Sequence, residues 1–233
     1  HLSIRRQRQM CIRDRVIVSQ FMLTFGSDPN AKITKKSKSP LSFHPIALIF
    51  GLLSFVSYLV EGAVGDWSAL YLFEDKGIVI EEAVMGVMLF NGTMCIGRLL
   101  GNRLGKHLTS KQVVVGGYLL GSIAMGLIVF LPGHASMYTY LLLGISLAMI
   151  VPNLFSAMGE QNVIPMTQAV ATSTMLGYMG VLMGPALIGF IAHGTSLTVA
   201  FIVLTTLLVV SAGIGKYAYH LMSKDCGLSE EQI

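Results

Sequence analysis

The chain has 233 residues, of which 53% are hydrophobic and 12% are charged, and its mean hydropathy is +0.68. Because soluble domains carry about 25% charged residues, this composition excludes an ordinary soluble domain and indicates an integral membrane protein. The net charge of +4 equals that of residues 1–15 alone, which contain five Arg and one Asp. The rest of the chain sums to zero, so its charge indicates no nucleic-acid partner.

Residues 1–15 include the stretch "RQMCIRDR". A back-translation of these eight residues resembles the transposon end of sequencing-library adapters, so we expect residues 1–15 to be an adapter artefact. The alternatives are a basic cytoplasmic leader and the n-region of a signal peptide, although the next apolar run is short and interrupted by Ser19 and Gln20. On the adapter interpretation, the chain is a fragment of a longer protein.

The remainder divides into a polar segment and a series of apolar runs. Residues 28–45 are polar, basic and contain prolines, and we expect residues 16–45 to form a cytoplasmic linker. A membrane-crossing helix needs about 20 apolar residues, and no run shows the period-two alternation of a membrane barrel. We therefore predict an all-α integral membrane fold with six transmembrane helices in residues 46–219, followed by a cytoplasmic tail at 220–233. The runs occupy residues 46–72, 83–104, 112–131, 136–158, 167–192 and 196–219.

The distribution of basic residues predicts the topology, because cytoplasmic loops carry an excess of Lys and Arg. The opposite loops contain "FEDKGIVIEE", "PGHAS" and "HGTS", which together hold one Lys. We expect a multi-pass protein of the cell inner (plasma) membrane with both ends of the chain cytoplasmic. The basic residues on the expected cytoplasmic side are Lys32, Lys35, Lys36, Lys38, Arg98, Arg103, Lys106, Lys111, Lys216 and Lys224.

The first span contains two carboxylates, which are costly inside a bilayer and usually functional. Glu61 lies roughly 22 Å along the helix from its start, which places it in the outer half of the membrane. We expect Glu61 to bind substrate or couple a proton; the alternative is a carboxylate satisfied by a neighbouring helix. Asp66 is a second candidate for this role, or an interfacial structural residue beside Trp67.

The second span places Asn91, Cys95 and Arg98 on one helical face. Asn91 lies deeper in the membrane and is a candidate for lining a substrate cavity. Arg98 lies near the cytoplasmic end, where its side chain either gates the path or extends to the membrane surface.

The stretch "GRLLGNRLGKHL" repeats glycine at every fourth position, with Gly97, Gly101 and Gly105. Small residues at this spacing let helices approach closely. Arg103 and Lys106 fall where the chain turns on the cytoplasmic side.

The fourth span carries Pro152 and Asn153, and Asn153 is a further candidate for substrate binding. Glu160 follows at the cytoplasmic end. It either pairs with Arg103 or Lys106 as a gate or is solvated.

The fifth span places Gly177, Gly180 and Gly184 on one face, followed by Pro185. Pro removes a backbone donor and kinks a helix. This smooth face suits a helix that slides or bends during a transport cycle, and the alternative is tight static packing.

Several of these stretches resemble the major facilitator superfamily (MFS). The family's cytoplasmic loop motif is G-x-L-a-D-R-x-G-R-K, and Gly101, Asn102, Arg103, Gly105 and Lys106 match its later positions, with Asn102 in place of the usual Asp. "EGAVGDWSALYL", "IVPNLFSAMG" and "GYMGVLMGPALIGFIA" resemble the seventh, tenth and eleventh helices of a bacterial inner-membrane branch of sugar or drug permeases.

The resemblance implies helices 7–12 of a twelve-helix fold, with substrate bound between two six-helix halves. It further implies proton-coupled secondary active transport of a small organic solute, sugar- or drug-like, by alternating access. The expected partners are the solute, the lipid bilayer and the missing N-terminal half, with no cofactor and no metal. The alternatives are a half-size transporter acting as a homodimer and a membrane scaffold or enzyme. An enzyme is not expected, because the six His lie near span ends or outside and no nucleotide-binding loop is present.

Overall fold

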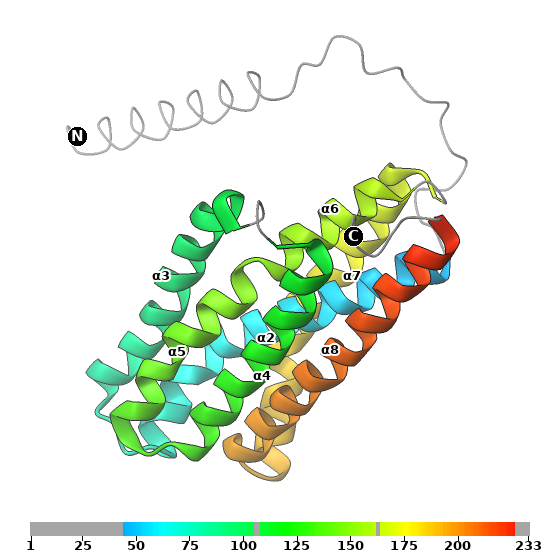
Figure 1. Cartoon of the computed structure of the whole chain (residues 1–233). Helices are drawn as coiled ribbons and strands as arrows, with labels where there is room; N and C mark the ends of the chain where they lie inside the picture. The colour runs from blue at the N-terminus through cyan, green and yellow to red at the C-terminus, as the bar shows by residue number, and fades with distance from the viewer. Residues whose placement is uncertain (1–43, 105–107, 162–163, 227–233) are drawn as a thin grey trace, which may run out of the picture. The chain divides into compact units, whose positions relative to one another are not determined.

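The structure is a computed structural model that describes residues 44–104, 108–161 and 164–226 (Figure 1). Within these ranges it contains α-helices and no strand, which confirms the all-α prediction. Six helical segments are long and apolar enough to cross a membrane, as the sequence predicts. The helices are α2 (Pro45–Glu74), α3 (Ile80–Leu104), α4 (Ser110–Phe130), α5 (Gly133–Ala148), α6 (Ile150–Glu160), α7 (Met166–Gly194) and α8 (Leu197–Cys226).

Helices α5 and α6 together form one span, Gly133–Gly159, that is interrupted at Met149. The interruption has a local cause in the sequence. Pro152 has no backbone N–H to donate to the carbonyl of Ala148, and its ring clashes with the turn before it. The carbonyl oxygen of Met149 accepts from the backbone N–H of Asn153 at 3.2 Å and from its amide Nδ2 at 2.8 Å, so backbone hydrogen bonding resumes directly after the break.

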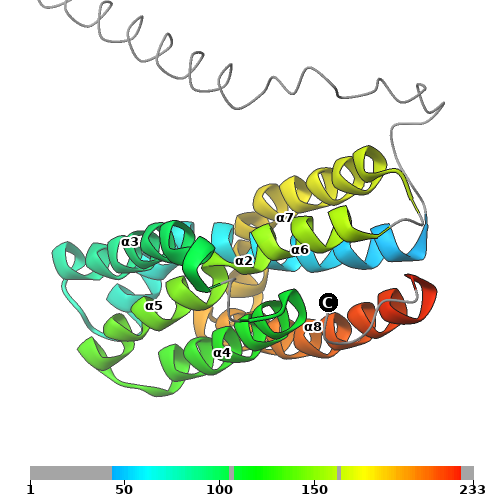
Figure 2. The same cartoon turned by 45° about the horizontal axis from the view of Figure 1, so that its top comes forward.

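Helix α2 lies at the centre of the described bundle and packs along α7, with further contacts to α3 and α8 (Figures 1 and 2). Helix α3 packs against α5, and α4 packs against α8 and α5. Of the apolar stretch of each span, 61% is buried in α2 but only 28% in α3 and 22% in α7. Among the described residues, α3 and α7 are therefore the two spans whose apolar stretches are least covered.

The seam between α2 and α7 depends on the glycines that the sequence places on one face of the fifth span. A Cβ atom on Gly184 would lie 2.6 Å from the backbone carbonyl oxygen of Leu59, and one on Gly180 would clash with the carbonyl of Phe55. Because these neighbours are backbone atoms, they cannot move aside as a side chain can. The two helices approach to backbone contact, as small residues allow in membranes.

Trp67 lies farther along the same seam, toward the C-terminal end of α2. Its indole Nε1 donates a hydrogen bond to the carbonyl oxygen of Pro185 at 3.0 Å, and its ring covers Gly189. The sequence places Trp67 in an aromatic belt at the membrane surface, whereas the structure gives it a specific partner on α7.

The loop after α2 is tied to the end of α4 by Lys76. The Nζ atom of Lys76 donates to the carbonyl oxygens of Val129 at 2.6 Å and Leu131 at 2.9 Å and lies 5.4 Å from the ring centre of Tyr71. Partial burial lowers the pKa of Lys76, and the neighbouring Asp75 acts in the opposite direction. Lys76 thus caps carbonyl groups at the C-terminus of α4.

Candidate functional site

Glu61 and Arg98, singled out in the first two spans, meet between α2 and α3. Nη2 of Arg98 on α3 donates to Oε1 of Glu61 on α2 at 3.1 Å and to Oε2 at 3.3 Å. The side chain of Glu61 is 17% exposed and that of Arg98 is 46% exposed. The carboxylate is therefore mostly covered, and the guanidinium closes its open side.

The pairing shows a contact for both residues, while their roles in transport stay predictions. Glu61 has a partner on a neighbouring helix, and the side chain of Arg98 reaches this partner rather than only the membrane surface. Glu61 is the seventeenth of the 30 residues of α2, so it lies near the middle of the helix. Opposite charges in a medium of low dielectric constant stabilise each other strongly, which makes the pair tolerable at this depth.

Two tyrosines that the sequence analysis missed extend this polar region. Tyr58 lies one helical turn before Glu61, within electrostatic reach of Glu61 and Arg98. Its ring stacks on that of Tyr178 from α7, with ring centres 6.2 Å apart and planes 6° apart. The available signal was the i, i+3 spacing of Tyr58 and Glu61, which places both on one face of a helix. We call Tyr58, Glu61, Arg98 and Tyr178 the polar cluster.

The cluster lies beside an exposed face of α3. Asn91 and Cys95 are both exposed on the same helix as Arg98, in agreement with their predicted common face. The Nδ2 atom of Asn91 donates to the carbonyl oxygen of Val87 at 2.9 Å. This hydrogen bond does not use the side-chain oxygen of Asn91. This face could therefore offer an amide, a thiol and a guanidinium to a solute.

Asp66 and Asn153 are not brought into the cluster by any hydrogen bond or ion pair in the part of the chain that the structure describes. Asp66 is exposed, and the amide of Asn153 bonds to its own helix as stated above. Their assignment to substrate binding stays a prediction.

The first two glycines of the loop motif pack α3 against α5. A Cβ atom on Gly97 would lie 2.6 Å from Cβ of Ala148, and one on Gly101 would clash with the side chain of Met149. Reciprocally, a Cβ atom on Gly144 of α5 would clash with the backbone of α3 at Phe90. The helix-packing role of this glycine repeat is thus visible in the structure.

Two later residues of the motif, Gly105 and Lys106, lie outside the described residues. The side chains of Asn102 and Arg103, and that of Glu160 on α6, are likewise not described. The gate between Glu160 and Arg103 or Lys106 therefore stays a prediction.

A second ion pair, which the sequence analysis did not identify, lies at the opposite end of the bundle. Nε2 of His134, in the first turn of α5, lies 2.7 Å from Oε2 of Glu82, in the first turn of α3. Both side chains are at least half exposed, so the pair contributes little to stability. It joins the first turns of α3 and α5, whereas Gly97 and Gly101 pack the later parts of the same two helices together.

The chain is similar in sequence to proteins named as transporters or membrane proteins. The chain is 40% identical over 168 residues to an uncharacterized MFS-type transporter of Yersinia pestis, covering 71% of this chain and 43% of that protein. It is 30% identical over 170 residues to membrane protein MosC of Rhizobium meliloti, covering 72% of this chain and 42% of that protein. An uncharacterized transporter of Sinorhizobium fredii is 28% identical over 159 residues. The chain thus spans less than half the length of the curated relatives it matches, and no family model matches it.

Two solved structures share the arrangement of the helices. One is the E. coli fucose:proton symporter FucP, with a TM-score of 0.66 and 16% identity over 75% of this chain and 43% of FucP. The other is described as the MFS transporter FucP in the outward conformation, with a TM-score of 0.64 at the same identity. At this identity the likeness establishes the fold alone.

Proposed function

We propose that the chain is one half of a secondary transporter. The proposal is supported by its fold, which is that of a major facilitator superfamily half, and by an MFS-type relative with 40% identity. The proposed cargo is a small organic solute, sugar- or drug-like, moved across the inner membrane by alternating access with both ends of this chain cytoplasmic. The observation that carries the proposal is the ion pair of Glu61 and Arg98 at membrane depth, beside an exposed polar face. Ionisable groups at this depth are costly and usually mark a solute or ion path.

The uncovered helices support the assignment to one half of a larger assembly. Helices α3 and α7 bury the smallest shares of their apolar stretches, yet they expose Asn91, Arg98 and Tyr178. An Arg facing hydrocarbon costs roughly 2.5–3.5 kcal/mol, so lipid is a poor cover for this face. We propose that six further helices, the N-terminal half, cover it and enclose the solute. A second copy of the chain is the alternative cover, in which case the chain is a half-size transporter acting as a homodimer.

The polar cluster suggests how a proton couples to the solute. In the proposed empty state the guanidinium of Arg98, which lies 3.1 Å from Oε1 of Glu61, favours the charged form of this carboxyl group. A solute with hydroxyl or carboxylate oxygens competes for the donors of Arg98, because a guanidinium carries five N–H donors and no acceptor. Once Arg98 turns toward the solute, the unpaired carboxylate is costly at this depth and takes up a proton. Solute binding and protonation therefore favour each other, which is the requirement for symport.

The aromatic residues complete the proposed solute site. The stacked rings of Tyr58 and Tyr178 provide flat apolar surfaces with hydroxyl groups at their edges. Such surfaces suit the faces of a sugar ring or an aromatic drug, and the hydroxyls fix orientation. Asn91 supplies a further amide on the α3 side of the same region.

The experiment is proton uptake by cells expressing the full-length transporter. Alkalinisation of a weakly buffered medium is measured after addition of each member of a panel of pentoses, hexoses and aromatic drugs. Wild type is expected to give alkalinisation with at least one compound. The variant Glu61→Gln is expected to abolish it while retaining exchange of the same labelled compound, since exchange needs no net proton movement.

The matched control is Glu82→Gln, which neutralises an exposed carboxylate at the outer end of α3. This variant is expected to behave as wild type. Unchanged alkalinisation by Glu61→Gln contradicts the coupling role of Glu61. Failure of the whole panel to be taken up or exchanged by wild type contradicts the proposed solute class.

A further inference from the structure

The serines of α2 behave differently from other hydroxyl residues of the bundle. A Ser or Thr inside a helix commonly donates to the carbonyl oxygen three or four residues earlier. This bond is present on α3, α4, α5 and α8, at Thr93, Ser122, Thr139, Ser146, Thr205 and Thr206. On α2, the hydroxyl groups of Ser54, Ser57 and Ser68 are fully buried and have no hydrogen-bond partner among the described residues. A buried hydroxyl group in this situation is costly, and ordered water is its usual partner.

These serines share one face of α2 with Glu61. Ser54, Glu61 and Ser68 recur at every seventh residue, and Ser57 lies three residues after Ser54. A period of 3.6 residues places all four side chains on the same side of the helix. Gly65 lies on this side between Glu61 and Ser68, is exposed, and would carry a Cβ atom that meets no heavy atom within 4 Å. The face therefore has hydroxyl groups on both sides of Glu61 and open space beside it.

Toward the start of α2, Ser57 lies beside Tyr118 of α4, and we call these two residues the first hydroxyl pair. Tyr118 is fully buried and within electrostatic reach of Glu61. Its hydroxyl group donates to the carbonyl oxygen of Leu53 at 2.7 Å, so its proton is not directed at Ser57. The phenol oxygen can still accept a hydrogen bond. One water molecule could therefore bond to both members of the first hydroxyl pair.

Toward the end of α2, Ser68 lies beside Tyr140 of α5, and we call these two residues the second hydroxyl pair. Tyr140 is fully buried, as is the neighbouring Tyr71. The hydroxyl groups of all three residues lack a hydrogen bond of acceptable geometry in the part of the chain that the structure describes. A buried water molecule typically makes two to four hydrogen bonds, and this cluster offers three.

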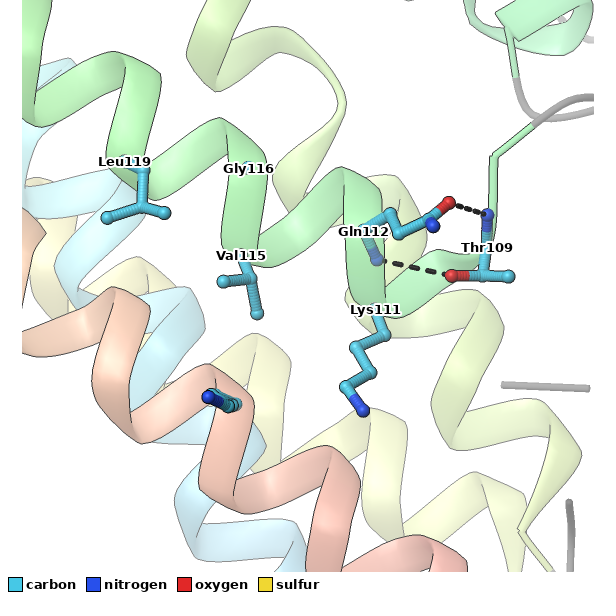
Figure 3. Close-up of a pocket in the computed structure, with 7 residues that line it drawn as sticks. Thr109, Lys111, Gln112, Val115, Gly116 and Leu119 are labelled. Atoms are coloured by element: carbon cyan, nitrogen blue, oxygen red, sulfur yellow. Dashed lines mark hydrogen bonds between the residues drawn. The ribbon is translucent and has the colours of Figure 1, made fainter. Parts of the chain in front are cut away.

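A surface groove approaches the first hydroxyl pair from the start of α4. The groove lies between the start of α4 and the C-terminal part of α8, and its volume is about 670 Å³ (Figure 3). Val115 lines it and lies three residues before Tyr118, roughly 4.5 Å of helix rise. In the orientation proposed above, the groove belongs to the cytoplasmic side. It would bring bulk water to within about one helical turn of the first hydroxyl pair.

We propose that the two hydroxyl pairs hold ordered water on either side of Glu61, and that this water carries the coupled proton along α2. The inference rests on the function proposed above, because it supplies a path for the proton that Glu61 exchanges. Ser57 is roughly 6 Å of helix rise from Glu61, and Ser68 is roughly 10.5 Å from it. At about 2.8 Å for each O–H···O bond, about three water molecules bridge the longer gap, where Gly65 leaves space.

Proton movement along this path consumes no group of the protein. Each water oxygen accepts one proton and releases another, so the chain of water is restored after every transfer. When Glu61 takes up a proton, an O–H bond of the adjacent water breaks and the carboxyl O–H bond forms. Release toward the other hydroxyl pair reverses this step. The serines and tyrosines keep the water in place and do not change their charge, so they are positioning residues.

The first arm of the test detects the water itself and needs no transport. The protein purified in detergent is exposed to a short X-ray pulse, which converts bound water into hydroxyl radicals that oxidise the nearest side chains. Mass spectrometry then quantifies oxidation at each aromatic residue. Tyr118 and Tyr140 are expected to be oxidised despite their full burial. Phe90, an equally buried aromatic residue of α3 that belongs to neither pair, is the internal reference.

Each hydroxyl pair serves as the matched control for the other. Ser57→Ala is expected to lower the oxidation of Tyr118 about fivefold and to leave that of Tyr140 unchanged. Ser68→Ala is expected to have the opposite selectivity. The factor of about five corresponds to the loss of one hydrogen bond of about 1 kcal/mol to the water. General loosening of the bundle would instead raise oxidation at both tyrosines.

The second arm measures proton movement by the full-length transporter in cells. Tyr118→Phe and Tyr140→Phe keep the ring and remove the hydroxyl group. Both are expected to slow solute-driven alkalinisation about fivefold, on the same estimate, while exchange of the labelled solute stays at the wild-type rate. A merely structural role would lower exchange and alkalinisation together. Tyr138→Phe, which alters an exposed tyrosine of α5, is the matched control and should behave as wild type.

The two arms separate this inference from the proposed function. Oxidation of Tyr118 and Tyr140 no greater than that of Phe90 would show that the hydroxyl pairs hold no water. Wild-type alkalinisation by both Tyr→Phe variants would show that the proton takes another path. A wild-type protein that gives no alkalinisation with any solute would refute the proposed proton coupling, and the proton path would fall with it. In that case the oxidation pattern would still decide whether the pairs bind water.

Discussion

The seam between α2 and α7 gives the sharpest structural prediction, through the substitution Gly180→Ala. The added Cβ atom would clash with the carbonyl oxygen of Phe55 and lie 3.1 Å from the backbone N of Leu59. Relief requires the two helices to separate, because both neighbours are backbone atoms. Overpacking a well-packed contact costs about 1–3 kcal/mol, and this position belongs at the upper end.

The expected net effect is smaller than the steric cost. Ala recovers about 1 kcal/mol of helix propensity relative to Gly. A net loss of about 2 kcal/mol lowers the melting temperature of a chain of this size by roughly 4–8 °C. The assay is thermal unfolding of the protein in detergent, followed by circular dichroism at the helix signal.

The matched control is Gly92→Ala on α3, where a Cβ atom meets nothing within 4 Å. It gains the helix propensity of Ala without the clash, so its melting temperature should equal or exceed that of wild type. If Gly180→Ala unfolds at the same temperature as Gly92→Ala, then α2 and α7 are not in backbone contact at this point and the description of the seam is wrong.

Two further predictions concern the same seam and the ion pair. Gly184→Leu is expected to abolish transport by the full-length protein while membrane insertion stays intact, because even the added Cβ atom would lie 2.6 Å from the carbonyl oxygen of Leu59. Normal transport by this variant would exclude both tight packing and a sliding role for Gly184. Arg98→Gln is expected to destabilise the protein by about 1–2 kcal/mol, below the 3–5 kcal/mol of a fully buried pair because Arg98 is about half exposed. The double variant Glu61→Gln/Arg98→Gln should regain this stability in the same unfolding assay, and a purely additive double variant would mean that the two residues do not interact.

The sequence predicts the spans because apolar length is a local property. Each predicted run falls within a few residues of a helix of the structure, and the largest difference is at α8, which continues to Cys226. The break at Met149 could not be placed in this way, because the run from α5 to α6 stays apolar across it. Pro152 was the available signal, since it lies four residues after the carbonyl that it leaves unpaired.

The sequence predicted some residues of the site but not the contacts between them. Glu61 was recognised as costly inside the bilayer and Arg98 as a residue near the cytoplasmic end. Their pairing depends on the rotation of α2 and α3 about their axes, which the sequence does not specify. The stacking of Tyr58 on Tyr178 joins residues from α2 and α7, 120 positions apart, and depends on the glycine seam that brings these helices together. For the same reason, Trp67 was predicted from its residue type to lie in an aromatic belt, and its bond to Pro185 was missed.

A long DNA read through the region upstream of Val16 in the source material tests whether this chain forms one half of a twelve-helix transporter. We expect an open reading frame that continues upstream in frame, lacks the codons of "RQMCIRDR" and encodes six more apolar spans. A natural start codon near Met22, or genomic DNA that encodes "RQMCIRDR", would contradict this expectation and make the six-helix chain the product. The exposed faces of α3 and α7 would then have to be covered by a second copy.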